Sequence, residues 1–247
     1  MNKFGIIGYG IVGKATHISL LKSQPVLIHD ISNGTNLSDL TTCNYVFFCT
    51  PTDNESSINT LIELIKQLKL INPTYHPVIR STVPIGVCRK IEQEIQDAIL
   101  YIPEFLRDRC WEVDCLSRPI IIGSTSQTLP DWLSLEESII CSLEEAEIIK
   151  MFSNNIASSK IVLANHFYAL SQSVGVDYSN VVNAYLQVTH DQNYLEATEN
   201  LRGFGGKCLP KDLDFLINTL ANLNLPQSYF TAMKEDNQLW PVTVRKS

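Results

Sequence analysis

The sequence lacks the features that mark membrane, fibrous or nucleic-acid-binding proteins. No apolar run is long enough to span a bilayer, and no repeat or low-complexity segment interrupts the chain. The 19 basic and 26 acidic residues leave a net charge of −7, which argues against a broad basic surface for nucleic acid or anionic lipid. With 45% hydrophobic and 18% charged residues, the composition predicts a soluble globular protein.

Patterns for metal or disulfide chemistry are also missing. The seven cysteines are an odd number without a CxxC pair, and the five histidines include no HExxH. Only three residues precede the first apolar run, which contains glycines and breaks early, unlike the core of a signal peptide. We therefore expect a cytoplasmic protein with reduced thiols and no metal site.

Two regions of different character follow one another. From residue 3 to about 123, short β-branched and apolar runs alternate with helix-like stretches, which predicts an α/β fold, a Rossmann-type doubly wound parallel sheet. The predicted strands lie at residues 3–7, 25–29, 45–49, 77–80, 99–102 and 119–122. We assign residues 1–135 to a NAD-binding domain and residues 136–247 to an all-helical domain.

The second region begins with a long helix. From residue 143 to about 174 the chain has no Pro or Gly, and its apolar residues recur at helical spacing. At 1.5 Å per residue this helix is about 45 Å long, more than a small domain needs. It therefore predicts a homodimer contact, with a buried helix inside one monomer as the alternative. Further helices are expected at 178–186 and 210–223, whereas the tail from 226 has weak periodicity.

A glycine-rich segment follows the first predicted strand. Gly8 permits a tight turn, Gly10 allows the backbone to approach a pyrophosphate, and Gly13 lets the next helix pack on the strand. The pyrophosphate would lie at the N-terminus of that helix, which begins with Ile11 and Val12. The alternative is a glycine turn that binds no ligand.

Polar residues at the ends of later strands extend this site. Asp30 ends the second predicted strand, where a carboxylate accepts hydrogen bonds from a ribose diol and repels the phosphate of NADP. No Arg or Lys lies among residues 31–34, so the sequence favours NAD as the cofactor. Thr50, Pro51 and Thr82 are expected near the nicotinamide end.

The segment 203–212, GFGGKCLPKD, carries the strongest catalytic pattern. Its three glycines form a loop able to approach a ligand closely, and Pro210 suits the start of a helix. Cys208 would lie near that helix N-terminus, beside Lys207 and Lys211, and both features favour a nucleophilic thiolate. Asp212, four residues on, shares its helical face. The other six cysteines are interpreted as structural.

Here the sequence resembles the UDP-glucose and GDP-mannose dehydrogenase family. Four ordered motifs carry the resemblance: GFGGKCLPKD at 203–212, STVPIG at 81–86, PEFLRD at 103–108, and the KxxxN pair of Lys150 and Asn154. The resemblance extends over essentially all of the chain. It implies oxidation of the primary alcohol of a nucleotide sugar by two hydride transfers to NAD, through a thiohemiacetal and a thioester on a cysteine.

The resemblance also implies a role for individual residues. Cys208 would be the nucleophile, with Lys150 and Asp212 stabilising the oxyanion and positioning water. Asp108 would handle water or protons, supported by Thr82 and Glu104, and Lys211 would contact the coenzyme. The implied sugar-binding residues are Glu104, Phe105, Leu106, Lys150, Asn154, Phe204 and Gly205.

Three departures from the family pattern stand out. Asp108 is one methylene shorter than the family's glutamate, and Asn193 occupies the place of an arginine that binds substrate phosphate across the dimer. Family members also continue into a further nucleotide-binding domain, whereas this chain ends at residue 247. The chain is therefore expected to lack the C-terminal UDP-binding domain, and to be either a natural short form that acts on a differently held sugar or a fragment whose activity is impaired.

Two other functions remain open at this point. A two-domain β-hydroxyacid dehydrogenase would use Lys150 for a single oxidation and leave Cys208 idle. A non-catalytic homologue would bind NAD and dimerise without turnover. The β-hydroxyacid dehydrogenase would form one NADH per product, whereas the sugar dehydrogenase would form two. The non-catalytic homologue would show no thiol reactivity at Cys208.

Overall fold

A computed structural model describes residues 2–22, 24–117, 119–126, 129–133, 136–189 and 194–242. The chain forms two compact units, Met1–Lys150 and Met151–Ser247, which are described separately. Asn193, one of the departures from the family pattern, lies outside the described residues.

The first unit is built on a mostly parallel sheet of seven strands in the order β2-β1-β3-β4-β5-β6-β7. The strands are β1 Phe4–Ile7, β2 Val26–His29, β3 Tyr45–Phe48, β4 His76–Ile79, β5 Leu100–Tyr101, β6 Ile120–Ser124 and β7 Ser138–Cys141. Every pair is parallel except β5 and β6. The predicted α/β class is thus confirmed, with one antiparallel pair and the additional strand β7.

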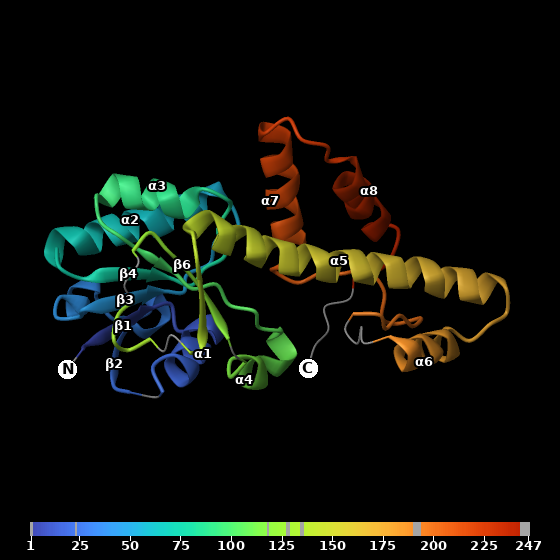
Figure 1. The fold of residues 1–247 in the computed structure, drawn as a ribbon, viewed down its shortest axis with the longest axis horizontal. Helices are drawn as coiled ribbons and strands as arrows, with labels where there is room; N and C mark the ends of the chain where they lie inside the picture. Colours follow the sequence, from blue (N-terminus) through green and yellow to red (C-terminus); the bar gives the residue numbers. More distant parts are fainter. Residues whose placement is uncertain are drawn as a thin grey trace. The chain divides into compact units, whose positions relative to one another are not determined.

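Helices cover this sheet, and Figure 1 shows α2 and α3 on one side of it and α1 on the other. The helices are α1 Ile11–Ser19, α2 Glu55–Ile71, α3 Val87–Ile95, α4 Trp111–Asp114 and the start of α5, Leu143–Ser173. Because both faces are covered, the central strands are mostly apolar, and Ile6, Phe47 and Val78 are completely buried. Trp132 packs edge-on against Phe4 and Phe47.

The second unit is helical. It contains the rest of α5, with α6 Tyr178–Val188, α7 Leu209–Asn222 and α8 Ser228–Asn237. Its core gathers Ile161, Val162, Phe204, Leu213 and Met233. The expected helices at 143–174, 178–186 and 210–223 are confirmed to within two residues, whereas α8 arises where the sequence shows only weak periodicity. No helix among the described residues is long and apolar enough to cross a membrane.

Candidate active site

The glycine loop between β1 and α1 has two glycines that the fold requires and one that faces open space. Gly8 has φ +86°, and a Cβ there would lie 2.7 Å from the carbonyl oxygen of Cys49. A Cβ on Gly13 would overlap the carbonyl oxygen of Gly8, whereas one on Gly10 would meet nothing within 4 Å. The N-terminus of α1 has no side-chain cap. The uncapped first turn of α1 and the open space at Gly10 therefore suit an anion.

Asp30 connects this loop to the end of β2. Its carboxylate accepts hydrogen bonds from Tyr9 N at 2.7 Å and from Ser32 Oγ at 2.6 Å and Ser32 N at 2.9 Å. The bond from the Ser32 hydroxyl, followed by the Tyr9 and Ser32 N–H groups, holds the pKa of Asp30 below its ordinary value. The carboxylate is thus ionised at neutral pH, and it orders the loop at the position where the sequence predicts a ribose contact.

Two loops at the carboxyl ends of β3 and β4 interlock. Ser81 Oγ donates to Thr50 O at 2.6 Å, and Thr52 Oγ1 donates to Thr82 O at 2.6 Å. Thr82 is buried, and Pro51 is exposed. Thr50 Oγ1 is itself buried without a hydrogen-bond partner among the described residues. Since buried hydroxyls are normally satisfied, this atom marks a place where a bound group would complete the hydrogen bonding.

Lys150 and Glu104 form a buried ion pair in the first unit. Lys150 Nζ lies 3.1 Å from Glu104 Oε1, and the two residues are 2% and 8% exposed. The other oxygen of Glu104 accepts from Leu106 N at 2.7 Å. Burial acts to raise the pKa of Glu104, but Lys150, the Leu106 N–H and Arg80 outweigh it and lower the pKa. Phe105 presents its ring 5.4 Å from Lys150 Nζ and is 40% exposed.

Asp108 is placed differently from this pair. It is exposed and begins a short 3-10 turn, Asp108–Cys110. Its neighbour Arg107 is held by Asp114 through hydrogen bonds of 2.7 and 2.9 Å. The structure therefore brings Lys150 and Glu104 together and leaves Asp108, four residues after Glu104, exposed on the surface.

In the second unit, Cys208 is the residue that immediately precedes α7, and it is exposed. Pro210 lies in the first turn of that helix, as the sequence predicts. The N–H of Asp212 donates to Cys208 O at 2.9 Å, which is the helical i to i+4 relation. Cys208 therefore lies at the positive end of a helix of 14 residues, one turn from an acidic side chain.

Asp212 is fully buried, and its two oxygens have unlike surroundings. Oδ2 accepts a short hydrogen bond from Asn154 Nδ2. Oδ1 lies 3.4 Å from Lys211 Nζ, yet it accepts no hydrogen bond from the described residues. The positive charge of Lys211 is therefore close enough to attract Oδ1, although the two groups are not aligned for a hydrogen bond. Asn154, Lys211 and Asp212 thus form one cluster within the second unit.

The glycine loop at 203–206 is held by residues that sequence reasoning missed. Phe204 N donates to Asn237 Oδ1 at 2.8 Å, and Asn237 Nδ2 donates back to Phe204 O at 2.9 Å. A Cβ on Gly203 would lie 2.8 Å from Asn237 Oδ1. Arg202 Nε donates to Asn165 Oδ1 at 2.7 Å, and its guanidinium lies 4.8 Å from the ring of Tyr168. No sequence signal pointed to Asn237, because α8 itself was not expected.

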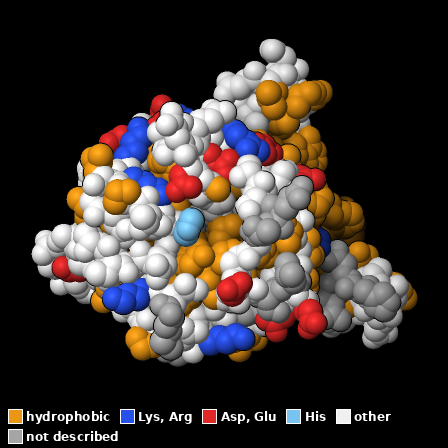
Figure 2. Space-filling model, turned by 60° about the vertical axis from the view of Figure 1, so that its left-hand side comes forward, with side chains coloured by type: hydrophobic (Ala, Val, Ile, Leu, Met, Phe, Trp, Pro, Cys, Tyr) orange, Lys and Arg blue, Asp and Glu red, His pale blue; other side chains and the backbone are white. Residues whose placement is uncertain are grey.

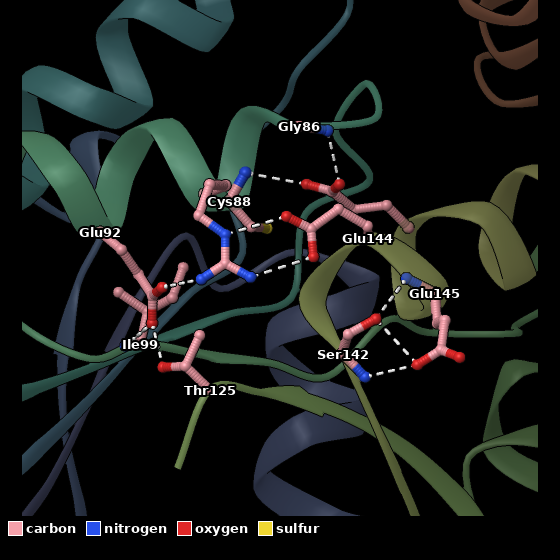
Figure 3. A network of polar contacts seen from close by, with 10 residues as sticks. Gly86, Cys88, Glu92, Ile99, Thr125, Ser142, Glu144 and Glu145 are labelled. Carbon is pink, nitrogen blue, oxygen red and sulfur yellow. Dashed lines mark hydrogen bonds and ion pairs between the residues drawn. The ribbon is translucent and has the colours of Figure 1, made fainter.

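Glu147 is the other missed residue, in the first unit. Its carboxylate accepts from Gly86 N at 2.6 Å and Cys88 N at 2.8 Å, so it caps the start of α3 from a distant helix. Figure 3 labels Gly86 and Cys88 at this position. In the sequence, Glu147 stands three residues before Lys150, so both lie on one face of the predicted long helix. This position is the signal that could have identified Glu147.

The remaining cysteines differ from Cys208. Three are buried and three half-buried. Burial raises the pKa of Cys43 and of Cys49 to about 11, which disfavours the thiolate. Within the described part of the chain, no group of His, Cys, Asp and Glu is arranged to hold a metal ion.

Acidic and basic side chains are interspersed on the face of the molecule in Figure 2, without a continuous field of one sign.

The parallel sheet, its glycine loop and the helical second unit define a Rossmann-type α/β protein with a helical companion unit. Residues 144–239 match the family model described as the UDP-glucose/GDP-mannose dehydrogenase family, central domain. This match confirms the resemblance predicted from the motifs and places these residues in the central domain of that family.

One curated relative agrees with this assignment, and two solved structures share the fold. A UDP-glucose 6-dehydrogenase of Campylobacter jejuni is 30% identical over 215 residues, covering 79% of this chain and 53% of its own length. The structure of a UDP-D-ManNAc dehydrogenase from Pyrococcus horikoshii superimposes with a TM-score of 0.76 at 20% identity, covering 96% of this chain and 68% of that one. Psf3 in complex with NADP+ and 2-OPP superimposes with a TM-score of 0.60 at 14% identity, covering 96% and 93%. The chain spans about half the length of the curated relatives it matches.

Proposed function

We propose that this protein oxidises the primary alcohol of a nucleotide sugar, of the UDP-glucose kind, to a carboxylate, with NAD as the acceptor and Cys208 as a covalent nucleophile. The carrying observation is the exposed Cys208 at the N-terminus of α7, one turn from the buried Asp212. The family match of residues 144–239 and the UDP-glucose 6-dehydrogenase relative support the choice of substrate class.

NAD is proposed as the coenzyme because the first unit offers the groups that it needs. The open space at Gly10 and the uncapped start of α1 suit a pyrophosphate, and the buried Thr50 hydroxyl lacks a hydrogen-bond partner among the described residues. Asp30 is ionised and repels a ribose 2′-phosphate, which favours NAD over NADP. When bound, NAD accepts the hydride at each oxidation.

The proposed reaction passes through two covalent intermediates on Cys208. The alcohol would lose a hydride and its hydroxyl proton to give an aldehyde. The Cys208 thiolate would add to the aldehyde carbon while the carbonyl oxygen takes up a proton, which gives a thiohemiacetal. Loss of a second hydride and of the hydroxyl proton gives a thioester. Water then attacks the thioester, releasing the carboxylate and returning the Cys208 sulfur. One cysteine thereby retains the reactive aldehyde through both oxidations.

The buried polar residues divide the remaining work. We assign Lys150, with Glu104 as its partner, to stabilise developing negative charge on the substrate oxygen. Asp212, oriented by Asn154, positions the hydrolytic water. Asp108 and Thr82 are assigned to proton or water handling. The sugar-contacting residues in this proposal are Glu104, Phe105, Leu106, Lys150, Asn154, Phe204 and Gly205, and Lys211 is assigned to the coenzyme.

We further propose that the protein is a homodimer through α5. Apolar side chains on this helix are exposed at spacings of three, four and seven residues, as in a helix stripe that faces a partner: Phe152, Ile156, Leu163, Phe167 and Leu170. Light scattering tests this assignment. A dimer mass that becomes monomeric in Phe167→Asp supports the proposal, and a monomeric unmodified protein contradicts it.

The activity is tested with NAD and a panel of UDP- and GDP-sugars, following NADH and sugar carboxylate together. We expect two NADH for each carboxylate, and Cys208→Ser is expected to abolish carboxylate formation. Cys110→Ser, at a half-buried cysteine, is the matched control and should leave the ratio unchanged. One NADH per product, or full turnover by Cys208→Ser, contradicts the proposal.

A further inference from the structure

The loop of residues 81–86 is fixed at both ends by side chains from outside it. At its start, the hydroxyl of Thr52 bonds to Thr82 O at 2.6 Å. At its end, Glu147 accepts hydrogen bonds from Gly86 N at 2.6 Å and Cys88 N at 2.8 Å. Figure 3 shows Gly86 and Cys88 at this end of the network, where α3 begins. The conformation of the loop therefore depends on Glu147.

Glu147 supplies a cap that α3 does not have in its own sequence. The residue preceding the helix is Gly86, with φ +90° and no capping side chain, and the first turn contains no acidic residue. Glu147 comes from α5, 61 residues away in the chain, and is 1% exposed. Two orphan N–H groups and the positive end of the helix are thus satisfied by one buried carboxylate.

Burial and hydrogen bonding act in opposite directions on the pKa of Glu147. Burial is the largest influence and raises the pKa of Glu147, while the N–H groups of Cys88 and Gly86 act to lower it. The two hydrogen bonds therefore do not fully offset the desolvation of the carboxylate. Any change that removes one of these bonds weakens the attachment of the loop to α5.

Glu147 and Lys150 lie one turn apart on α5, and each binds a different loop. Lys150 pairs with Glu104 in the segment 103–108, and Glu147 binds the end of the segment 81–86. Residues three apart share a helix face, so the start of α5 ties both loops to one rigid element. We propose that Glu147 is a positioning residue, which holds the 81–86 loop in the conformation that receives the nicotinamide end of the coenzyme. The inference rests on the proposed function, with NAD as the coenzyme, and on the sequence-based expectation that Thr82 in this loop lies near the nicotinamide end.

The test compares NADH binding to Glu147→Gln and to the unmodified protein by fluorescence titration. The glutamine amide group faces one of the two N–H donors, so one hydrogen bond is lost and the NADH Kd should rise about tenfold (~1.4 kcal/mol). In turnover, the KM for NAD should rise while the KM for the sugar stays unchanged. Glu145→Gln is the matched control, because Glu145 also accepts from a backbone N–H, that of Ser142 at 2.8 Å, but does not contact the loop.

An unchanged NADH Kd in Glu147→Gln overturns the inference, even if the protein oxidises sugars as proposed. Absence of NADH binding by the unmodified protein overturns the proposed function as well, so the two failures are distinguishable. If Glu147→Gln does not fold, hydrogen exchange on the unmodified protein decides. Amides in the peptide covering residues 83–90 should gain protection on adding NADH, and equal exchange with and without NADH contradicts the proposal.

Discussion

Each unit buries one carboxylate of the candidate site, and the two carboxylates are stabilised in different ways. Glu104, in the first unit, has a lysine at 3.1 Å and a backbone N–H at 2.7 Å, one for each oxygen. Asp212, in the second, has an amide on one oxygen and, on the other, Lys211 at 3.4 Å without a hydrogen bond from the described residues. Both oxygens of Glu104 thus have a partner within the protein. Oδ1 of Asp212 can still accept a hydrogen bond, for example from a water molecule. We therefore expect the loss of Lys150 to destabilise the fold more than the loss of the Asp212 carboxylate, and the loss of the Asp212 carboxylate to act on the reaction more than on stability.

The largest expected effect is on stability, from Lys150→Met. Removing the lysine leaves Glu104 buried without its nearest cation, which should lower the free energy of unfolding by about 3–5 kcal/mol. Lys66→Met is the matched control, because Lys66 lies 2.6 Å from Glu94 but at the surface, and its loss should cost less than about 1 kcal/mol. Urea denaturation measures both. Equal losses in the two variants would show that burial does not set the strength of the Lys150 pair.

Asp212→Asn should separate chemistry from folding. The asparagine preserves shape and can still accept from Asn154, so the unfolding free energy should change by about 1 kcal/mol or less. Carboxylate formation should fall about 100-fold, since a positioned carboxylate that handles water or protons contributes on that order. Asp214→Asn, an exposed residue of the same helix that pairs with Lys234 at 2.6 Å, is the control. A stability loss as large as that of Lys150→Met would contradict the contrast between the two carboxylates.

Asn237→Asp tests how the loop beside Cys208 is held. The aspartate can accept from Phe204 N but repels Phe204 O, so one bond is lost and a charge is buried. We expect a stability loss of about 1–3 kcal/mol and a rise in the KM for the sugar, without a change in NADH affinity. Gln238→Glu, at the exposed neighbouring residue, should behave as the unmodified protein. A changed NADH Kd with an unchanged KM for the sugar would contradict this prediction, because it would mean that Asn237 affects the coenzyme site and not the sugar site.

The smallest expected effect is a pH dependence. The folded-state pKa of Glu104 lies below its ordinary value of 4.5, so the group contributes stability above that pH and loses it as the pH falls through the folded value. Carbon NMR titration of the Glu104 carboxyl should show protonation below pH 4.5. A midpoint above 4.5 would mean that desolvation dominates over Lys150.

Much of the fold follows from sequence patterns that are local. Strong apolar runs predicted the strands from β1 to β6, and a long segment without Pro or Gly predicted α5. The strand β7 and the helix α8 were missed because their segments lack a clear apolar period, and β7 keeps Ile139 and Ile140 partly exposed. Tertiary packing stabilises these elements, and a local pattern does not report it.

The same limit applies to the candidate site. The glycine loop, Asp30, Lys150 and Cys208 stand in ordered motifs, and their local geometry matches the expected turns and helix ends. Glu147 and Asn237 act on backbone atoms 61 and 33 residues away. The residues next to Glu147 and Asn237 in the sequence do not indicate these distant hydrogen-bond partners. The assignments of residues to catalysis, and the domain boundary at residue 135, remain predictions.

The central claim is that Cys208 carries the substrate covalently. Acid quenching during turnover with NAD and UDP-glucose, followed by peptide mass spectrometry, tests it directly. We predict a sugar acyl adduct on the peptide that contains Cys208, which disappears when NAD is omitted and is absent from Cys208→Ser. Turnover to the carboxylate with every cysteine peptide unmodified throughout the time course would contradict the claim.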